Sequence, residues 1–177
     1  MNRRVAIPAV ALLAAIAVAV GLYLFQPWRI FTSSTVTEEI PAVAPPPSQS
    51  AGPSDMPAAV APHELVTGKL ISHEHASSGT VKILELADGS RILRFEGLDT
   101  SDGPDLRVWL SDAPVIEGAA GWYLFDDGAY LDLGALKANK GDQNYEIPAG
   151  ANLADYSSVS IWCARFAVSF AAAELTG

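Results

Sequence analysis

The stretch Tyr156-Ser-Ser-Val-Ser-Ile-Trp-Cys-Ala-Arg-Phe-Ala-Val-Ser-Phe170 contains the single cysteine of the chain, Cys163. Its apolar residues recur with a period of two, at Trp162, Ala164, Phe166, Val168 and Phe170. This alternation predicts one β-strand with these residues on one face, where Trp and Phe are favoured. Cys163 would then lie on the opposite face, outside the main apolar stripe.

Cys163 has two interpretations from its position in this stretch. A free cysteine is commonly a small, inert, buried hydrophobe. Alternatively, Cys163 is a redox thiol or a ligand of a metal or haem. Arg165 lies two residues on, on the same predicted face, and its positive charge would stabilise a thiolate there.

An apolar run without charge extends from Val5 to Phe25, directly after Arg3 and Arg4. A helix needs about 20 such residues to cross a bilayer. No convincing cleavage site follows the run, although Ala17-Val18-Ala19 inside it leaves cleavage open. Residues 1–28 are therefore predicted to be a signal anchor, a transmembrane helix with a cytoplasmic N-terminus and the rest of the chain outside the cytoplasm.

Residues 29–64 are predicted to be a disordered stalk. The segment 33–62 is rich in Pro, Ala, Ser and Thr, and includes Pro45-Pro46-Pro47. It has no aromatic residue and no apolar period, so it should stay extended and solvated. At about 3.1 Å per residue it would reach on the order of 90 Å and hold the folded domain away from the membrane.

Residues 65–177 are predicted to form one domain, since they are enough for a single modest core. Short runs with β character are separated by turn residues, and Asp88-Gly89 between two of them is a strong hairpin signal. This pattern predicts an all-β fold, an antiparallel β-sandwich of jelly-roll-like type, or a barrel. The predicted strands are Leu65–His73, Thr80–Leu86, Arg91–Phe95, Leu106–Ser111, Trp122–Phe125, Tyr130–Leu133, Asn144–Ile147 and Val159–Phe170.

The charge of this domain limits its partners. From His63 onward there are eight Lys and Arg against seventeen Asp and Glu, which accounts for the net charge of -9. An acidic domain makes nucleic acid and anionic membrane surfaces poor partners. The usual catalytic motifs for hydrolases, nucleotide-binding enzymes and zinc proteases are absent, so no catalytic residue is predicted and an enzyme is not favoured.

His73 and His75 are two residues apart at the end of the first predicted strand. If that strand extends so far, both imidazoles lie on one face about 7 Å apart and could bind one transition metal. The candidate metal ligands are therefore His73, His75 and Cys163. The alternative is a pair of exposed histidines at a strand end.

Four motifs in order resemble one known family. They are His75-Ala76-Ser77-Ser78-Gly79, Gly103-Pro104-Asp105-Leu106, Asn144-Tyr145-Glu146-Ile147-Pro148, and Ile161-Trp162-Cys163 with Phe166. The pattern is similar to the DM-thirteen domain, which also occurs beside DOMON domains in Skeletor-type animal proteins.

The resemblance implies a β-sandwich in which the cysteine matched by Cys163 acts in electron transfer, as a bare thiol or through haem or another bound group. It implies a role for His75, whereas His63 and His73 match no motif of the family. Asp105, Tyr145 and Trp162 also match motif positions, with turn formation or core packing as the alternative to a role at the site.

Together these observations favour a membrane-anchored, extracytoplasmic redox protein. Its site candidates are Cys163, His75 and Arg165, with haem or a soft transition metal as candidate cofactors and an envelope redox partner. The rival hypothesis is a non-catalytic surface module that binds an envelope polymer or a protein through Trp109 and Trp122-Tyr123. A hydrolase is a distant third.

Overall fold

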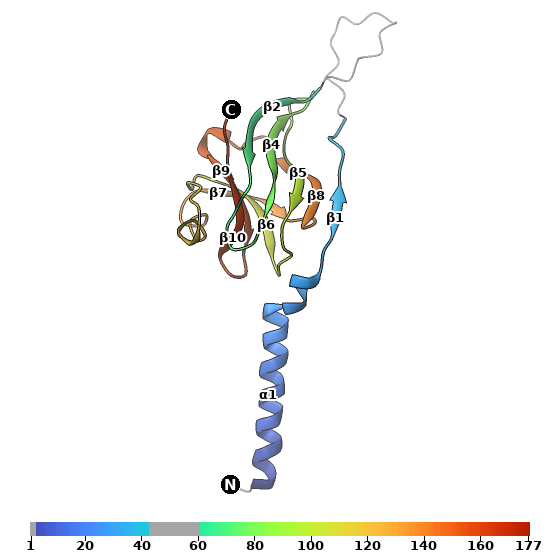
Figure 1. Cartoon of the computed structure of the whole chain (residues 1–177), viewed down its shortest axis with the longest axis vertical. Coiled ribbons are helices and arrows are strands. Elements are labelled where there is room, and N and C mark those ends of the chain that lie inside the picture. Colours follow the sequence, from blue (N-terminus) through green and yellow to red (C-terminus); the bar gives the residue numbers. More distant parts are fainter. Residues whose placement is uncertain (1–2, 43–60) are drawn as a thin grey trace, which may run out of the picture.

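The computed structural model describes residues 3–42 and 61–177, and gives one long helix followed by a β-sandwich (Figure 1). The helix α1 spans Arg3–Phe25, and a short 3-10 helix, η1, spans Pro27–Phe31. Among the residues that the structure describes, no helix is long and apolar enough to cross a membrane.

Two five-stranded sheets form the sandwich, as predicted. The first has the order β1-β8-β5-β4-β2 and the second β3-β10-β9-β6-β7, and every pair is antiparallel except β1 with β8. The strand bounds are β1 Thr35–Thr37, β2 His63–Lys69, β3 Ile71–Ser72, β4 Ser78–Glu85, β5 Arg91–Asp99, β6 Leu106–Ser111, β7 Tyr130–Ala135, β8 Lys140–Ile147, β9 Ser158–Cys163 and β10 Val168–Glu174.

The main core lies between the two sheets, because alternate residues of each strand face inward. It includes Val81, Ile83, Leu93 and Phe95 from the first sheet, and Val108, Leu110, Val159 and Ile161 from the second. Burying side chains of this kind stabilises the fold by about 1.5–3 kcal/mol each. A backbone bridge between Thr67 and Thr176 links β2 to the C-terminal end of the chain.

The stretch Tyr156–Phe170 is a hairpin, so the prediction of one continuous strand was wrong. β9 ends at Cys163 and β10 begins at Val168, and residues 164–167 form the turn between them. The turn contains no Gly or Pro, and Ala167 takes the left-handed conformation with φ 50°. Alternating hydrophobicity runs through both arms and conceals a turn of this kind.

The predicted strand Leu65–His73 was wrong, because it breaks at Leu70 into β2 of the first sheet and β3 of the second. Most other predicted strands were placed with errors at their ends. Leu106–Ser111 is confirmed without change, and the Asp88-Gly89 turn joins β4 to β5. The predicted strand Trp122–Phe125 was wrong, because these residues lie in the long connection between β6 and β7. That connection, residues 112–129, covers the outer face of the second sheet with Ala113, Val115, Leu124 and Phe125.

Part of the predicted stalk belongs to the folded domain. Thr35, Val36 and Thr37 form β1, which pairs in parallel with Lys140, Gly141 and Asp142 of β8. β-branched residues favour a strand there despite the polar composition of the segment. The prediction of a free spacer is therefore wrong for residues 29–42, and the remainder, 43–60, lies outside the described residues.

Candidate functional site

Cys163 is the last residue of β9 and lies in the main core. It pairs with Leu106 of β6 and with Val168 of β10, and its side chain is fully buried. It does face away from Trp162, as predicted. However, the face it occupies is the inner one, shared with Ile161, so the prediction that it lies outside the main apolar stripe was wrong.

Burial raises the pKa of the Cys163 thiol above its ordinary value of 9.0. The backbone N–H groups of Phe166, Arg165 and Asp105 act in the opposite direction, and the negative charge of Glu74 acts with burial. The thiol therefore stays protonated in the folded protein at neutral pH.

Arg165 does not stabilise a thiolate through its side chain. It lies in the turn between β9 and β10, is exposed, and its Nη1 donates to the carbonyl oxygen of Leu24 at 3.4 Å. The predicted Cys163–Arg165 pairing was wrong because it assumed that both residues belong to one strand. The hairpin turn separates them.

His75 contacts Phe170, which is a member of the core cluster that contains Cys163. Its imidazole packs against Phe170 with 3.9 Å between ring centroids and a tilt of 35° between the planes. The carboxylate of Glu74 lies 3.8 Å from Nε2 of the same imidazole. His75 is therefore a half-buried residue at the edge of the core.

His73 lies on the other side of β10. Its Nδ1 is 2.8 Å from the hydroxyl of Ser169, which also accepts a hydrogen bond from Ser160 at 2.9 Å. The ring is buried against Phe125, and burial lowers its pKa. β3 ends at Ser72, so the prediction that His73 and His75 share one strand face was wrong.

The surroundings of Cys163 do not fit a haem or a soft metal ion. Cys163 belongs to a cluster of buried hydrophobic residues that includes Leu106, Val108 and Phe170. Within residues 3–42 and 61–177, no three His, Cys, Asp or Glu side chains are grouped so that they could hold a metal ion. A thiolate ligand would also require loss of a proton that burial stabilises.

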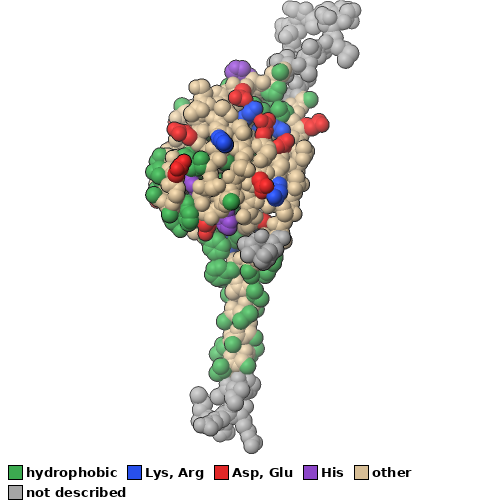
Figure 2. All heavy atoms as spheres, in the orientation of Figure 1, with side chains coloured by type: hydrophobic (Ala, Val, Ile, Leu, Met, Phe, Trp, Pro, Cys, Tyr) green, Lys and Arg blue, Asp and Glu red, His purple; other side chains and the backbone are tan. Residues whose placement is uncertain are grey.

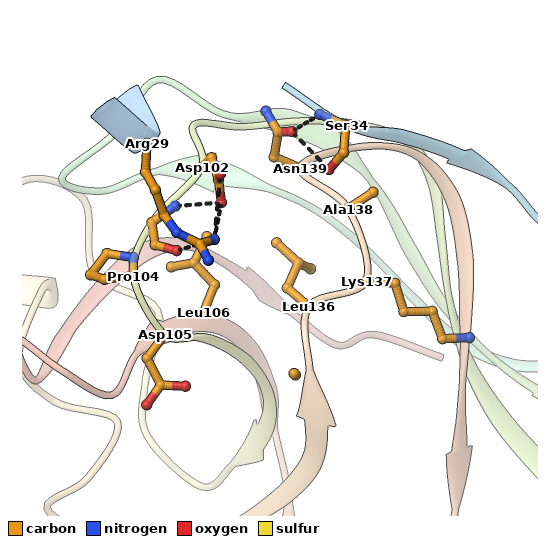
Figure 3. A pocket seen from close by; sticks show the side chains of 12 residues that line it. Arg29, Ser34, Asp102, Pro104, Asp105, Leu106, Leu136, Lys137, Ala138 and Asn139 are labelled. Atoms are coloured by element: carbon orange, nitrogen blue, oxygen red, sulfur yellow. Dashed lines mark hydrogen bonds and ion pairs between the residues drawn. The ribbon is translucent and has the colours of Figure 1, made fainter. Parts of the chain in front are cut away.

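The motif Gly103–Leu106 is held by the segment that follows α1. Arg29 Nη1 lies 3.2 Å from a carboxylate oxygen of Asp102 and donates to the carbonyl of Gly103 at 3.2 Å, and Thr32 donates to Asp102 at 2.6 Å. Figure 3 shows Arg29 and Ser34 reaching the wall of a pocket of about 270 Å³ beside this motif. Sequence reasoning missed this contact because its two halves are far apart in the chain.

Further along, the same segment is fixed by ionic and amide contacts. Lys137 Nζ donates to both carboxylate oxygens of Glu38 at 2.8 and 2.9 Å, and this hydrogen bond is the largest cause of the lowered pKa of Glu38. The amide of Asn144 donates to the same carboxylate at 2.7 Å, and the backbone of Ser34 donates to Asn139 at 2.7 Å. We call residues 29–40 with these contacts the N-terminal clamp.

Three aromatic rings are stacked on the outer face of the second sheet. The ring centroids of Tyr130 and Trp109 are 4.0 Å apart with an angle of 11° between the planes, and those of Trp109 and Trp162 are 5.1 Å apart with 23°. Tyr130 is exposed, whereas Trp109 and Trp162 are buried. We call this row the Tyr130–Trp109–Trp162 stack.

The stack corrects the surface-binding hypothesis. Trp109 was expected to be exposed because it alternates away from the main core, but the loop 112–129 and Tyr130 cover it. Of the proposed contact residues, Trp122 is half-buried and Tyr123 alone is well exposed. A row of binding aromatics is therefore not present at these positions.

Comparison with known proteins identifies the family of this chain. A family model described as Electron transfer DM13 matches residues 69–175, which is more than half of the chain. The chain belongs to this family. Neither the comparison with curated proteins nor the comparison with solved structures returned a match.

The DM13 match covers the sandwich from the end of β2 to the end of β10. It leaves out α1, η1 and β1, so the N-terminal clamp lies outside the matched region. Inside it, the first, second and fourth of the motifs that carry the resemblance meet at one end of the sandwich, whereas the third, residues 144–148, lies toward the other end, where Ile147 pairs with Arg91. His75 contacts Phe170, Leu106 pairs with Cys163, and the backbone N–H of Ala164 donates to the carbonyl of Asp105 at 2.9 Å.

Tyr145, from the third motif, has a structural role. Its hydroxyl donates to Gln143 at 2.7 Å and accepts from the backbone N–H of Lys137 at 2.9 Å. Burial raises its pKa to about 12, so it stays protonated. It therefore fixes the connection between β7 and β8.

Proposed function

We propose that this DM13 protein is a cofactor-free electron-transfer protein in which the Tyr130–Trp109–Trp162 stack carries charge between the surface and Cys163. The family description supports electron transfer as the activity. The observation that supports this route is the stack itself, because Trp162 precedes Cys163 in the chain and the two lie back to back on β9.

Phenol and indole side chains can each lose one electron, and stacked rings exchange electrons readily. Tyr130 is 45 % exposed and can be approached by a partner, whereas Trp109 and Trp162 are shielded from water. The buried Nε1 of Trp109 has no hydrogen-bond partner in the described part of the chain. No hydrogen-bond acceptor therefore helps that indole to lose its proton. Its oxidised form remains a radical cation, which can take an electron from the next group in the route.

Cys163 is the proposed inner end of the route. An oxidant at Tyr130 removes one electron, and the electron is replaced in turn from Trp109, Trp162 and the thiol of Cys163. The thiol loses its proton as its electron leaves, and the proton passes to solvent. The products are one reduced oxidant, one released proton and a cysteine thiyl radical. A one-electron reductant of the envelope then supplies an electron, and a proton taken back from water restores the thiol.

The place of action is proposed from the sequence. The uncharged run Val5–Phe25, preceded by Arg3 and Arg4, supports a single membrane tether with the N-terminus in the cytoplasm. The DM13 domain would then act outside the cytoplasm, where a redox partner of the cell envelope meets it. The acidic surface supports a partner other than nucleic acid.

The route is tested by flash photolysis of the purified full chain with a photochemical one-electron oxidant. All variants carry Trp28→Phe, which removes the exposed indole beside α1. Replacing Trp109 with Phe keeps an aromatic ring but removes the central indole, and the fast formation of the Trp162 radical should disappear. Cys163→Ala should prolong the lifetime of that radical, since the last electron donor is missing.

Trp122→Phe is the matched control. Trp122 is also an indole in the loop region and packs against the main core cluster, but its ring is tilted against Tyr123 at 6.4 Å and is not part of the stack. This variant should leave both rates unchanged. Equal radical formation in Trp109→Phe and the parent would exclude the stack, and an unchanged lifetime in Cys163→Ala would exclude the sulfur.

A further inference from the structure

We infer that the end of the sandwich that contains Cys163 and His75 rests directly on the lipid bilayer, with the turn between β9 and β10 as the contact. This end is formed by residues 73–77, 102–106 and 163–168, and we call it the helix-facing end. The inference rests on the proposed membrane tether. It names the surface to which the site is presented, which neither the family nor the sequence indicates.

The turn between β9 and β10 packs against the last turn of α1. The rings of Phe166 and Phe25 are stacked with 5.7 Å between centroids, and Arg165 donates to the carbonyl of Leu24 at 3.4 Å. α1 ends at Phe25, and Gln26 takes a left-handed conformation with φ 41° before η1 begins. The last turn of α1 therefore lies directly against the folded domain.

The N-terminal clamp prevents the domain from moving away from the helix. Arg29 is fixed to Asp102 and Gly103, four residues beyond the end of α1. Four residues span at most about 14 Å when fully extended. The domain therefore stays next to the end of α1, in contrast to the 90 Å stalk that composition predicts.

The exposed apolar surface of α1 continues onto the domain at this junction. Tyr23 is 70 %, Phe25 62 %, Trp28 50 % and Phe166 41 % exposed, and aromatic side chains of this kind are enriched at membrane–water interfaces. Figure 2 shows hydrophobic side chains gathered where the helix meets the domain. Single exposed apolar residues are ordinary, but a continuous group beside an apolar helix indicates a membrane surface.

Charge at the junction fits the same surface. Arg165 carries a long side chain that can keep its charged group at the headgroup level while its stem stays in apolar surroundings, and the charge of Arg29 is paired with Asp102. The acidic domain as a whole gains nothing from anionic lipid. The contact is therefore carried by apolar burial and should form on neutral phosphatidylcholine.

The geometry has a consequence for the redox route. Cys163 is three residues from Phe166 and lies on the bilayer side, whereas Tyr130 begins β7 and is open to water. The proposed stack would therefore join the bilayer side of the domain to its aqueous flank.

The test uses the full chain in phosphatidylcholine liposomes, with a nitroxide label at Phe166→Cys in a Cys163→Ala background. The control position is Asp88→Cys, in the turn at the other end of β4, which is about 26 Å long. The label at 166 should collide more with lipid-soluble oxygen than with a water-soluble nickel complex, and the label at 88 should do the reverse. Equal aqueous exposure at both positions would overturn the inference.

One further measurement separates the possible failures. Flotation of the liposomes after alkaline carbonate treatment reports the tether alone; a chain that does not float would refute the tether and the contact together. A floating chain with an aqueous label at 166 would refute only the contact, and neither result affects photolysis in detergent. If Cys163→Ala does not fold, the same positions are labelled on folded protein that retains the buried Cys163.

Weakening the N-terminal clamp by mutation gives an independent test of the contact with the bilayer. Arg29→Gln combined with Asp102→Asn should increase the aqueous exposure of the label at 166. Lys140→Gln, which removes the exposed ion pair with Asp99 at 2.9 Å, should not. An unchanged label in the first variant would contradict the clamp as the cause of the contact.

Discussion

The imidazole of His75 lies on the ring of Phe170, with 3.9 Å between the two centroids. Because Phe170 is part of the core cluster of Cys163, this pair forms part of the cover of that cluster on the helix-facing end. The histidine that sequence motifs associate with the cysteine therefore contacts a phenyl ring that it helps to hold in place.

Removing the phenyl ring should make the thiol accessible. We expect Phe170→Ala to lower the free energy of unfolding by about 3–5 kcal/mol and to increase the rate at which Cys163 reacts with an aromatic disulfide reagent. His75→Gln should change both quantities far less, because the half-exposed imidazole covers rather than fills the core. Equal reaction rates in Phe170→Ala and the parent protein would show that Phe170 does not limit access.

The raised pKa of Cys163 gives a pH dependence with a defined sign. The unfolded chain loses this proton near the ordinary value of 9.0, whereas the folded protein retains it to higher pH. The free energy of unfolding should therefore fall as pH rises above 9.0, and Cys163→Ala should reduce this fall. Urea titrations at several alkaline pH values measure it, and identical slopes in both proteins would contradict it.

His73 should make the protein sensitive to acid. Burial lowers its pKa below the ordinary value of 6.5, so the unfolded chain binds a proton before the folded protein does as pH falls. Stability is present above 6.5 and should decline as pH falls below it. Urea unfolding between about pH 7 and 5 should show a smaller decline in His73→Gln than in the parent.

The exposed His63 provides the control for this measurement. His63→Gln removes an imidazole without changing any buried group, so its acid sensitivity should equal that of the parent. A smaller decline in His63→Gln than in His73→Gln would assign the acid sensitivity to His63 and contradict the role given to His73.

Gly141 of β8 lies close to the backbone of β1. A Cβ atom there would meet the carbonyl oxygen of Val36, and the residue has φ +97°. Gly141→Ala should therefore displace β1, which hydrogen exchange at residues 35–38 would detect. Gly134→Ala shares the positive φ, at +115°, but has open space around the added atom.

The comparison of these two variants isolates the contact with β1. Both lose about 1–2 kcal/mol to the left-handed conformation, and Gly141→Ala should lose about 1–3 kcal/mol more. If exchange in β1 is unchanged in Gly141→Ala, the clamp is held by its polar contacts alone.

Trp109 should be needed for stability. It is buried between Tyr130 and Trp162, so Trp109→Ala should cost about 3–5 kcal/mol in chemical denaturation. Tyr123→Ala removes an exposed ring and should stay within about 0.5 kcal/mol of the parent. A stable Trp109→Ala protein would contradict the packing described for the stack.

Period-two alternation identified the sandwich and most of its strands, because the inner faces of both sheets are regular. It failed at residues 164–167, where Ala167 adopts a left-handed turn without a Gly or Pro to mark it. That one error misplaced Arg165, since the strand model put its side chain beside Cys163. Local pattern gives the face of a residue only within one element.

Contacts between distant segments could not be predicted at all. Composition alone suggested that Thr35–Thr37 was part of a spacer, whereas its pairing with β8 depends on Gly141 about a hundred residues away. The stack and the burial of Trp109 depend in the same way on Tyr130 and on the covering loop. The importance of Cys163 and the family could be predicted from the sequence, but the environment of the thiol could not.

The N-terminal clamp also bears on how the domain is produced for experiments. A fragment that starts at residue 69, where the family match begins, would lack β1 and nearly all of β2, which are the two edge strands of the first sheet. The unpaired backbone of β8 and β4 would then be open to association with other copies. Expression should therefore start at or before Arg29, since a shorter fragment is expected to aggregate.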